Sequence, residues 1–354
     1  MPMGKGFAIN SNHELGAMVC EGYARYTQSS TSSDDRPKAL PRIRVAAIAN
    51  DAVSTLMSLM YSTRPMLHSK TVIGLILGTG CNAATLMDLE AIGPSKWPPM
   101  QRSSGRSEVV VNTEWTIRGA AGPLRELGLV SCWDSDLHKS THVPGYQPFE
   151  YMTAGSYLGE VVRLVVRDWY TDVLSISESH LPPALKTRNA LTTTFLARSV
   201  AIAEDSSALA SELNRMGVLG SNEHWVWTAE LAHALLEAER AVLRRSAAMI
   251  AAAIVGLLLS TGELALEAPR SSGANATPAA SQPVRELVVT YCGGLICLYK
   301  GYRQQLQESI GYLLGQLEIH QRGTRIMLRE ASEGGIVGAA VLAGTAPEGP
   351  GPMR

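Results

Sequence analysis

Residues 71–83 read TVIGLILGTGCNA, and this stretch decides the fold. The run from Thr71 to Leu77 is apolar and rich in β-branched residues, which favours a buried strand. Gly78-Thr79-Gly80 then interrupts the apolar run and indicates a tight turn. A second strand is expected over Asn82–Met87. The sequence therefore predicts a sheet in which two strands meet at a glycine-rich turn.

Strands and helices alternate around this stretch. Further strands are predicted over residues 43–48 (IRVAAI), 108–111, 286–291 and 324–328. Helices are predicted from residue 15 onward and over residues 52–61, 157–169, 229–259, 301–317 and 335–342, of which 229–259 is either one long helix or a kinked pair. Mixed β-sheets flanked by helices follow, which is an α/β, or α+β layered, fold.

Composition and charge exclude several classes of protein. The chain has 354 residues, is 45% hydrophobic and 18% charged, and carries a formal net charge of −1. These values suit a globular protein with a large core and give no reason to expect a nucleic acid or an anionic membrane as partner. The longest apolar run, residues 247–259, is too short to span a bilayer and is expected to be a buried helix.

Five scattered cysteines form no CxxC pair, so neither a disulfide framework nor a zinc site is expected. A reducing cytosol is the simplest compartment, and no apolar signal core begins the sequence. One domain is expected over residues 1–343, with loops at 27–41, 92–108 and 263–282 and a disordered tail at 344–354.

The first of four motifs that could carry chemistry is residues 49–55, ANDAVST, at the end of a predicted strand. The carboxylate of Asp51 can take the proton from a hydroxyl that attacks a phosphoryl group. The alternative is that Asp51 only caps the helix that begins at Ala52.

The glycine-rich turn at Gly78-Thr79-Gly80 is the second motif. Glycines let a backbone approach phosphates closely, and a threonine hydroxyl can add a hydrogen bond. The alternative is an ordinary hairpin turn. The turn is not a P-loop, because no Gly-Lys-Ser/Thr follows it.

Two further motifs each place a carboxylate at the boundary of an element. They are residues 111–115, VNTEW, with Glu114, and residues 144–151, PGYQPFEY, with Glu150. Carboxylates and amides suit sugar hydroxyls because each takes part in several hydrogen bonds. Taken singly, each carboxylate could equally be a solvated charge or a helix cap.

In this order the four motifs resemble the hexokinase family, which has Val-Asn-Asp-Thr-Val-Gly-Thr, Gly-Thr-Gly-x-Asn-Ala, Asn-x-Glu-Trp and Pro-Gly-x-x-x-(Phe/Tyr)-Glu-Lys segments. The last leads into a helix reading Gly-x-Tyr-x-Gly-Glu-x-x-Arg, which here is residues 155–163, GSYLGEVVR. The resemblance runs from about Gly4 to Leu342. It implies an actin-like ATPase, or ribonuclease H-like, fold and mostly the carboxy-terminal large domain.

The resemblance also implies an activity: ATP-dependent phosphorylation of a hexose 6-hydroxyl with Mg²⁺, as in glycolysis. Asp51 would be the catalytic base. The sugar would be bound by Lys5, Asn50, Asn82, Glu114 and Glu150, and the nucleotide by Gly78, Thr79, Gly80, Thr193, Gly293 and Gly294. No residue of this chain is assigned as a metal ligand.

Some positions depart from the family pattern. Gly4, Cys292 and Gly294 stand where the family has Thr, Asp and Ser, and the amino-terminal lobe with the first phosphate loop is expected to be missing. Three hypotheses therefore stay open: an active kinase, a non-catalytic sugar sensor or regulator, or a truncated gene model of a longer protein. A cytoplasmic location and no nucleic-acid or membrane partner are expected; the preferred hexose and the oligomeric state are not predicted.

Overall fold

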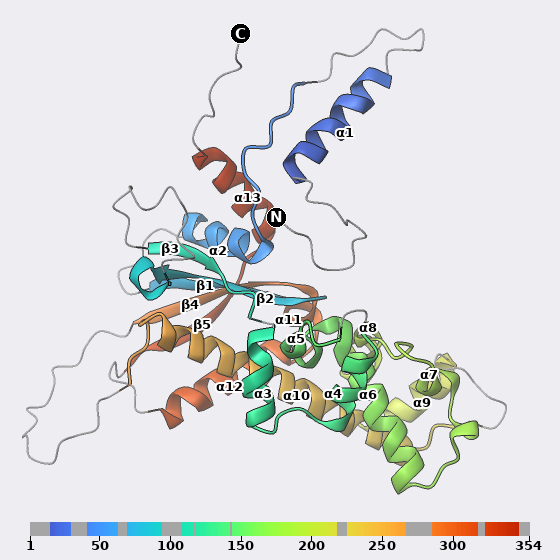
Figure 1. The fold of residues 1–354 in the computed structure, drawn as a ribbon. Helices are drawn as coiled ribbons and strands as arrows, with labels where there is room; N and C mark the ends of the chain where they lie inside the picture. The colour runs from blue at the N-terminus through green and yellow to red at the C-terminus, as the bar shows by residue number, and fades with distance from the viewer. Residues whose placement is uncertain are drawn as a thin grey trace, which may run out of the picture.

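A five-stranded mixed sheet lies at the centre of the molecule, with helices on both faces (Figure 1). This arrangement comes from a computed structural model that describes residues 15–29, 41–62, 69–93, 108–115, 118–141, 144–217, 225–266, 285–317 and 323–346. Lys5, the carboxy-terminal end from residue 347 and most of the three predicted loops lie outside the described residues.

The sheet has the strand order β3-β2-β1-β4-β5. Its strands are β1 (Ser69–Leu77), β2 (Cys81–Asp88), β3 (Glu108–Asn112), β4 (Glu286–Cys292) and β5 (Arg325–Glu330). The pairs β1–β2 and β2–β3 are antiparallel, whereas β1–β4 and β4–β5 are parallel. The predicted mixed sheet is confirmed, and residues 71–83 form most of the central strand β1 and the start of its antiparallel neighbour β2.

Helix α2 (Asp51–Ser62) packs on one face of the sheet, and α13 (Gly334–Thr345) packs on α2. Two glycines allow the close approach. A Cβ atom on Gly74 would lie 2.4 Å from the carbonyl oxygen of Ala52, and one on Gly338 would lie 1.8 Å from that of Ser54. Neither position has room for a side chain. The backbone of α2 therefore lies in direct contact with β1 on one side and with α13 on the other.

The other face carries the larger layer of helices and most of the core. These helices are α3 (Ala121–Glu126), α4 (Cys132–Lys139), α5 (Pro148–Thr153), α6 (Gly155–Asp168), α7 (Pro183–Lys186), α8 (Thr193–Phe195), α9 (Ser206–Met216), α10 (Ala229–Ser260), α11 (Gly294–Leu298) and α12 (Tyr302–Gln316). A π-helical turn, η5 (Trp169–Val173), continues α6. Thus the residues between β3 and β4, and those between β4 and β5, build a separate helical layer beneath the sheet.

Among the described residues one helix, α10, is long and apolar enough to cross a membrane, judged by length and composition alone. Its side chains Leu235, Ile250 and Leu258 are fully buried in the main core. Burial between α6, α9 and α12 accounts for this composition. The helix is continuous from Ala229 to Ser260, so the single-helix alternative of the sequence analysis is correct.

The predicted strand at residues 43–48 is wrong. This segment is irregular and pairs with no described strand, and the side chains of Ile43 and Ile48 are 41% and 48% exposed. An apolar β-branched run marks a segment able to form a strand, but a strand forms only where a partner supplies the ladder of hydrogen bonds. Here the segment lies beside α1 (Leu15–Ser29) instead, since a Cβ on Gly16 would lie 3.5 Å from Val45.

Two predicted boundaries also differ from those in the structure. Helix α1 continues to Ser29, beyond the predicted loop start at residue 27, and α13 continues to Thr345, beyond the predicted domain end at residue 343. In both places a threonine hydroxyl donates to a backbone carbonyl one turn back: Thr27 to Ala24 and Thr345 to Val341. Such bonds let a polar residue end a helix rather than begin a loop.

Candidate sugar and nucleotide site

A cluster of amides and carboxylates lies where α2 begins and where β2 and β3 lie side by side. Asn50 directly precedes α2, Asp51 is its first residue, and Asn82 is the second residue of β2. Asn112 ends β3, and Glu114 follows two residues later. The antiparallel pairing of β2 with β3 places Asn112 opposite Ala84, so segments 30 residues apart in sequence share one site.

Hydrogen bonds hold this cluster together. The amide Nδ2 of Asn82 lies 2.7 Å from Asn112 Oδ1, 3.3 Å from Asn50 Oδ1 and 3.4 Å from Glu114 Oε1. Asn112 in turn donates to Glu114 Oε1 at 2.9 Å. An amide group has two hydrogens, so Asn82 cannot serve three oxygens at once. The cluster therefore keeps acceptor capacity for the hydroxyl of a ligand.

Asp51 lies at the exposed edge of this cluster. The backbone N–H of Ala52 is 2.9 Å from both Asn50 Oδ1 and Asp51 Oδ1. Capping of α2 is thus shared with Asn50, and it occupies only one carboxylate oxygen of Asp51. The two readings of Asp51, helix cap and proton acceptor, are compatible in this geometry.

Glu114 and Glu150 are held in unusual environments. Glu114 has a φ of 44°, in the left-handed region that non-glycine residues seldom adopt, at a cost on the order of 1–3 kcal/mol. Glu150 is buried at the start of α5, and its Oε2 accepts from the backbone N–H of Cys81 at 3.2 Å. Through Cys81, Glu150 lies next to Asn82. Strain and a buried carboxylate are typical of binding sites.

A cavity of about 560 Å³ lies on the other side of the Gly78-Thr79-Gly80 turn. The turn joins β1 to β2 as a hairpin, with Gly78 N–H donating to the carbonyl of Gly80 at 3.0 Å. The same turn accepts backbone hydrogen bonds from Gly155 (2.8 Å, to Gly78) and Ser156 (3.3 Å, to Thr79) at the start of α6. The hairpin turn therefore also forms one wall of the cavity.

Most of the predicted nucleotide residues line this cavity: Gly78, Thr79, Thr193 and Gly294. Gly293, with a φ of 128°, lets its loop cross the hairpin, since a Cβ there would lie 2.5 Å from Leu77. Thr193 Oγ1 accepts from Gly159 N–H at 2.9 Å, which ties α8 to α6. Gly80, whose carbonyl accepts from Gly78 N–H, and Gly293 are not among the lining residues.

Sequence reasoning missed two polar features. Asn112 lies inside the VNTEW motif yet received no role, and it bridges Asn82 to Glu114. Its position opposite a predicted site strand could have revealed it. The buried pair of Glu160 and Arg163, 2.6 Å apart, positions Asn189 at the cavity wall, because Asn189 N–H donates to Glu160. No cluster of three metal-ligating side chains occurs among the described residues.

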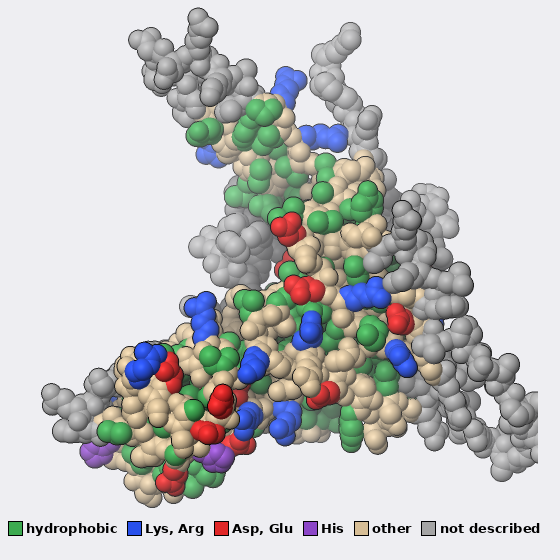
Figure 2. Space-filling model, turned by 180° about the vertical axis from the view of Figure 1, so that it is seen from behind, with side chains coloured by type: hydrophobic (Ala, Val, Ile, Leu, Met, Phe, Trp, Pro, Cys, Tyr) green, Lys and Arg blue, Asp and Glu red, His purple; other side chains and the backbone are tan. Residues whose placement is uncertain are grey.

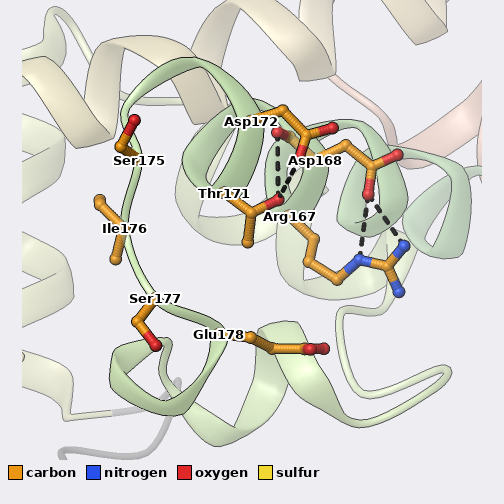
Figure 3. A pocket seen from close by; sticks show the side chains of 8 residues that line it. All are labelled: Arg167, Asp168, Thr171, Asp172, Ser175, Ile176, Ser177 and Glu178. Atoms are coloured by element: carbon orange, nitrogen blue, oxygen red, sulfur yellow. Dashed lines mark hydrogen bonds and ion pairs between the residues drawn. The ribbon is translucent and has the colours of Figure 1, made fainter.

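A separate, open hollow of about 740 Å³ lies at the far end of α6, beside η5 (Figure 3). In Figure 3 the guanidinium of Arg167 turns to Asp168, which it contacts at 2.8 Å, and Thr171 bonds Asp172. No residue predicted to bind sugar or nucleotide lines it. Cavity size alone therefore does not locate the candidate site.

Comparisons with solved structures agree on the fold, which is the actin-like ATPase fold of the hexokinases. A hexokinase from Schistosoma mansoni, solved in complex with glucose, aligns with a TM-score of 0.64 and 25% identity over 84% of this chain and 57% of its own. Another hexokinase structure aligns with a TM-score of 0.59 and 24% identity.

Sequence comparison gives the family itself. The hexokinase family pattern matches residues 72–345, and the chain belongs to the hexokinase family. Hexokinase-1 of Nicotiana tabacum is 32% identical over 85% of this chain, and putative glucokinase-2 of Saccharomyces cerevisiae is 30% identical over 86%. The matched regions are 53% and 58% of those relatives, so the chain spans about half their length.

Proposed function

We propose that this chain provides the hexose-binding site and the catalytic base for ATP-dependent phosphorylation of a hexose 6-hydroxyl. The observation that carries the proposal is the cluster of Asn50, Asn82, Asn112 and Glu114 with Asp51 at its edge, and the nucleotide-type cavity across the hairpin. Amides and carboxylates at these distances fit vicinal hydroxyls, each of which donates one hydrogen bond and accepts others. Glucose bound to a related hexokinase supports a hexose as the ligand.

In the proposed reaction, Asp51 accepts the proton of the sugar 6-hydroxyl as its oxygen attacks the terminal phosphorus of ATP. The new O–P bond forms as the bond to the bridging oxygen of ADP breaks, and the products are hexose 6-phosphate and ADP. Transfer of a phosphoryl group depends mostly on positioning and charge stabilisation. Asn50 is suited to position Asp51 because both bond the N–H of Ala52.

In the proposed complex, the backbone of Gly78 and the hydroxyl of Thr79, both at the hairpin, bind the nucleotide phosphates. Mg²⁺ typically keeps several waters and binds through nucleotide phosphates with one or two carboxylates. Among the described residues no group of three metal-ligating side chains occurs. When bound, Mg²⁺ would neutralise charge on the phosphates; no residue here is assigned to it.

A second candidate function is sugar binding without turnover. It is favoured by residues 292–294, Cys-Gly-Gly, where the loop that crosses the hairpin carries no hydroxyl for a phosphate. The sugar-type cluster is independent of this loop, because none of its hydrogen bonds involves residues 292–294.

Calorimetry with glucose and a coupled assay of glucose 6-phosphate formation on the purified chain test both candidates. The kinase proposal predicts glucose binding and turnover that falls about 10²–10⁴-fold in Asp51→Asn while glucose affinity stays within a few-fold. Asp172→Asn, at the distant hollow, is the matched control and should leave both unchanged. Binding without turnover in the unaltered chain would support the second candidate, and absence of glucose binding would contradict both.

A further inference from the structure

A cavity of about 320 Å³ lies between α3, α4 and α5, away from the sugar cluster and the nucleotide cavity. Its walls are largely apolar: Leu124, Val130, Pro148 and Met152. Leu124 and Met152 are buried and belong to the main core. The volume is at the lower end of the range of small-molecule sites, roughly 300–1,000 Å³. The cavity is therefore suited to the apolar part of a small ligand.

Basic side chains also line this cavity. Arg125 and Lys139 both contribute, as does His138. Lys139 bonds Asp136 at 3.0 Å, but both side chains are more than half exposed, so this ion pair is weak. Lys139 can therefore leave Asp136 for the carboxylate of a ligand. The guanidinium of Arg125 has one bond to the carbonyl of Ala121, through Nε, which leaves its fork of terminal N–H groups the geometry to hold a carboxylate.

The acidic residue of the lining does not cancel this positive charge. Asp134 is buried and accepts two hydrogen bonds from Arg245, at 2.6 and 2.8 Å, and another from Ser131 at 2.6 Å. Its charge is balanced on the side of α10. The cavity thus combines apolar walls with a cationic lining, which is the chemistry that recognises an amphipathic anion.

We propose that this cavity is a binding site for a small apolar carboxylate, with the aromatic or aliphatic body between Leu124 and Met152 and the carboxylate at Arg125. Gly145 keeps the side next to His138 open, because a Cβ there would lie 3.6 Å from the His138 ring. The ring of His138 stands edge-on to Tyr151, with centroids 5.5 Å apart, so the two rings pack against each other on this side of the cavity.

The site is connected to the sugar cluster by α5, and this second step rests on the proposed function. Pro148, Tyr151 and Met152 line the cavity and are spaced three and four residues apart, so they share one face of the helix. Glu150 lies on the opposite face and bonds the N–H of Cys81, next to Asn82. A ligand that shifts α5 moves Glu150 at the sugar site, and linkage makes the effect reciprocal.

Calorimetry on the full chain with 2-naphthoate, and with the uncharged analogue 2-naphthylmethanol, tests the site. We expect naphthoate to bind at least tenfold more tightly than the alcohol. Arg125→Gln should remove this preference, and Arg215→Gln, an exposed arginine on α9 that pairs with Glu212, should retain it. Ala121→Phe, which adds a ring at the cavity, should weaken both ligands.

Equal affinity for the two compounds, or naphthoate binding that Arg125→Gln leaves unchanged, would overturn the site. Coupling is read from the glucose dissociation constant with and without saturating naphthoate, and we expect a change of about fivefold or more. If both ligands bind but neither changes the dissociation constant of the other, only the proposed coupling is overturned. A chain that binds naphthoate but no glucose would refute the proposed function and leave the carboxylate site standing.

Discussion

At the scale of single residues, Asn112 orients two side chains of the sugar cluster at once. Its amide accepts from Asn82 and donates to Glu114, at 2.7 and 2.9 Å. Removal of one partner leaves polar groups without their bonds, which costs about 1–3 kcal/mol. Asn112→Ala should therefore weaken glucose binding about tenfold or more by calorimetry. Asn214→Ala, which breaks two bonds to Trp227 elsewhere, should lower stability without this loss of affinity.

Glu239 is a buried carboxyl on α10, and it accepts a hydrogen bond from the hydroxyl of Tyr299. Burial raises the pKa of Glu239 above its ordinary value of 4.5. Because the folded-state pKa is raised, the contribution of this group to stability is full below pH 4.5 and is lost as the pH rises through the folded-state pKa.

The substitution Glu239→Gln should therefore stabilise the protein at pH 7 and leave stability near pH 4 almost unchanged. Glutamine keeps an oxygen that can accept from Tyr299 and removes the buried charge. Urea unfolding at both pH values measures the difference. Glu230→Gln, an exposed position in the first turn of the same helix, is the control and should show no such pH-dependent gain. An equal shift at both pH values would contradict the mechanism.

At the scale of elements, the contact of α2 with α13 depends on Gly338. A methyl group there would meet the carbonyl of Ser54 at 1.8 Å, so Gly338→Ala should destabilise the protein by about 1–3 kcal/mol. Gly335→Ala in the same helix meets nothing within 4 Å and should be neutral or stabilising by roughly 0.5–1 kcal/mol. Thermal unfolding compares the two variants, and similar melting temperatures would refute close packing of α2 on α13.

Elements with a strong local pattern were predictable from sequence, and those that depend on a partner were not. The run TVIGLIL gave a buried strand, since its sheet neighbours β2 and β4 are present on both sides. The similar run at residues 43–48 gave none, because no described strand pairs with it. The motifs indicated Asn82, Glu114 and Glu150, but the bridge that Asn112 makes to Asn82 and the cavity beside α5 depend on separate segments that are brought together in space.

At the scale of the whole molecule, the two helical layers differ in how well they are covered. The layer of α1, α2 and α13, together with residues 41–50, exposes large apolar side chains, and Figure 2 shows hydrophobic side chains gathered there. We call this the α1–α13 apolar surface; it includes Val19, Ile43, Ile48, Tyr61 and Ile336, which are 41–74% exposed. A soluble monomer rarely exposes a contiguous apolar patch of this kind.

We expect this surface to drive self-association of the purified chain. Full burial of an aliphatic side chain contributes about 1.5–3 kcal/mol, and about 1.4 kcal/mol is tenfold in a dissociation constant. Val19→Ser, Ile43→Ser and Ile336→Ser combined should therefore raise the dissociation constant more than tenfold. Light scattering coupled to size-exclusion chromatography over a dilution series measures it. Serine at Leu127, Ile202 and Val226, equally exposed but scattered over the other layer, should leave association as in the parent chain. If both triple variants associate alike, general stickiness of the chain and not the α1–α13 apolar surface is responsible.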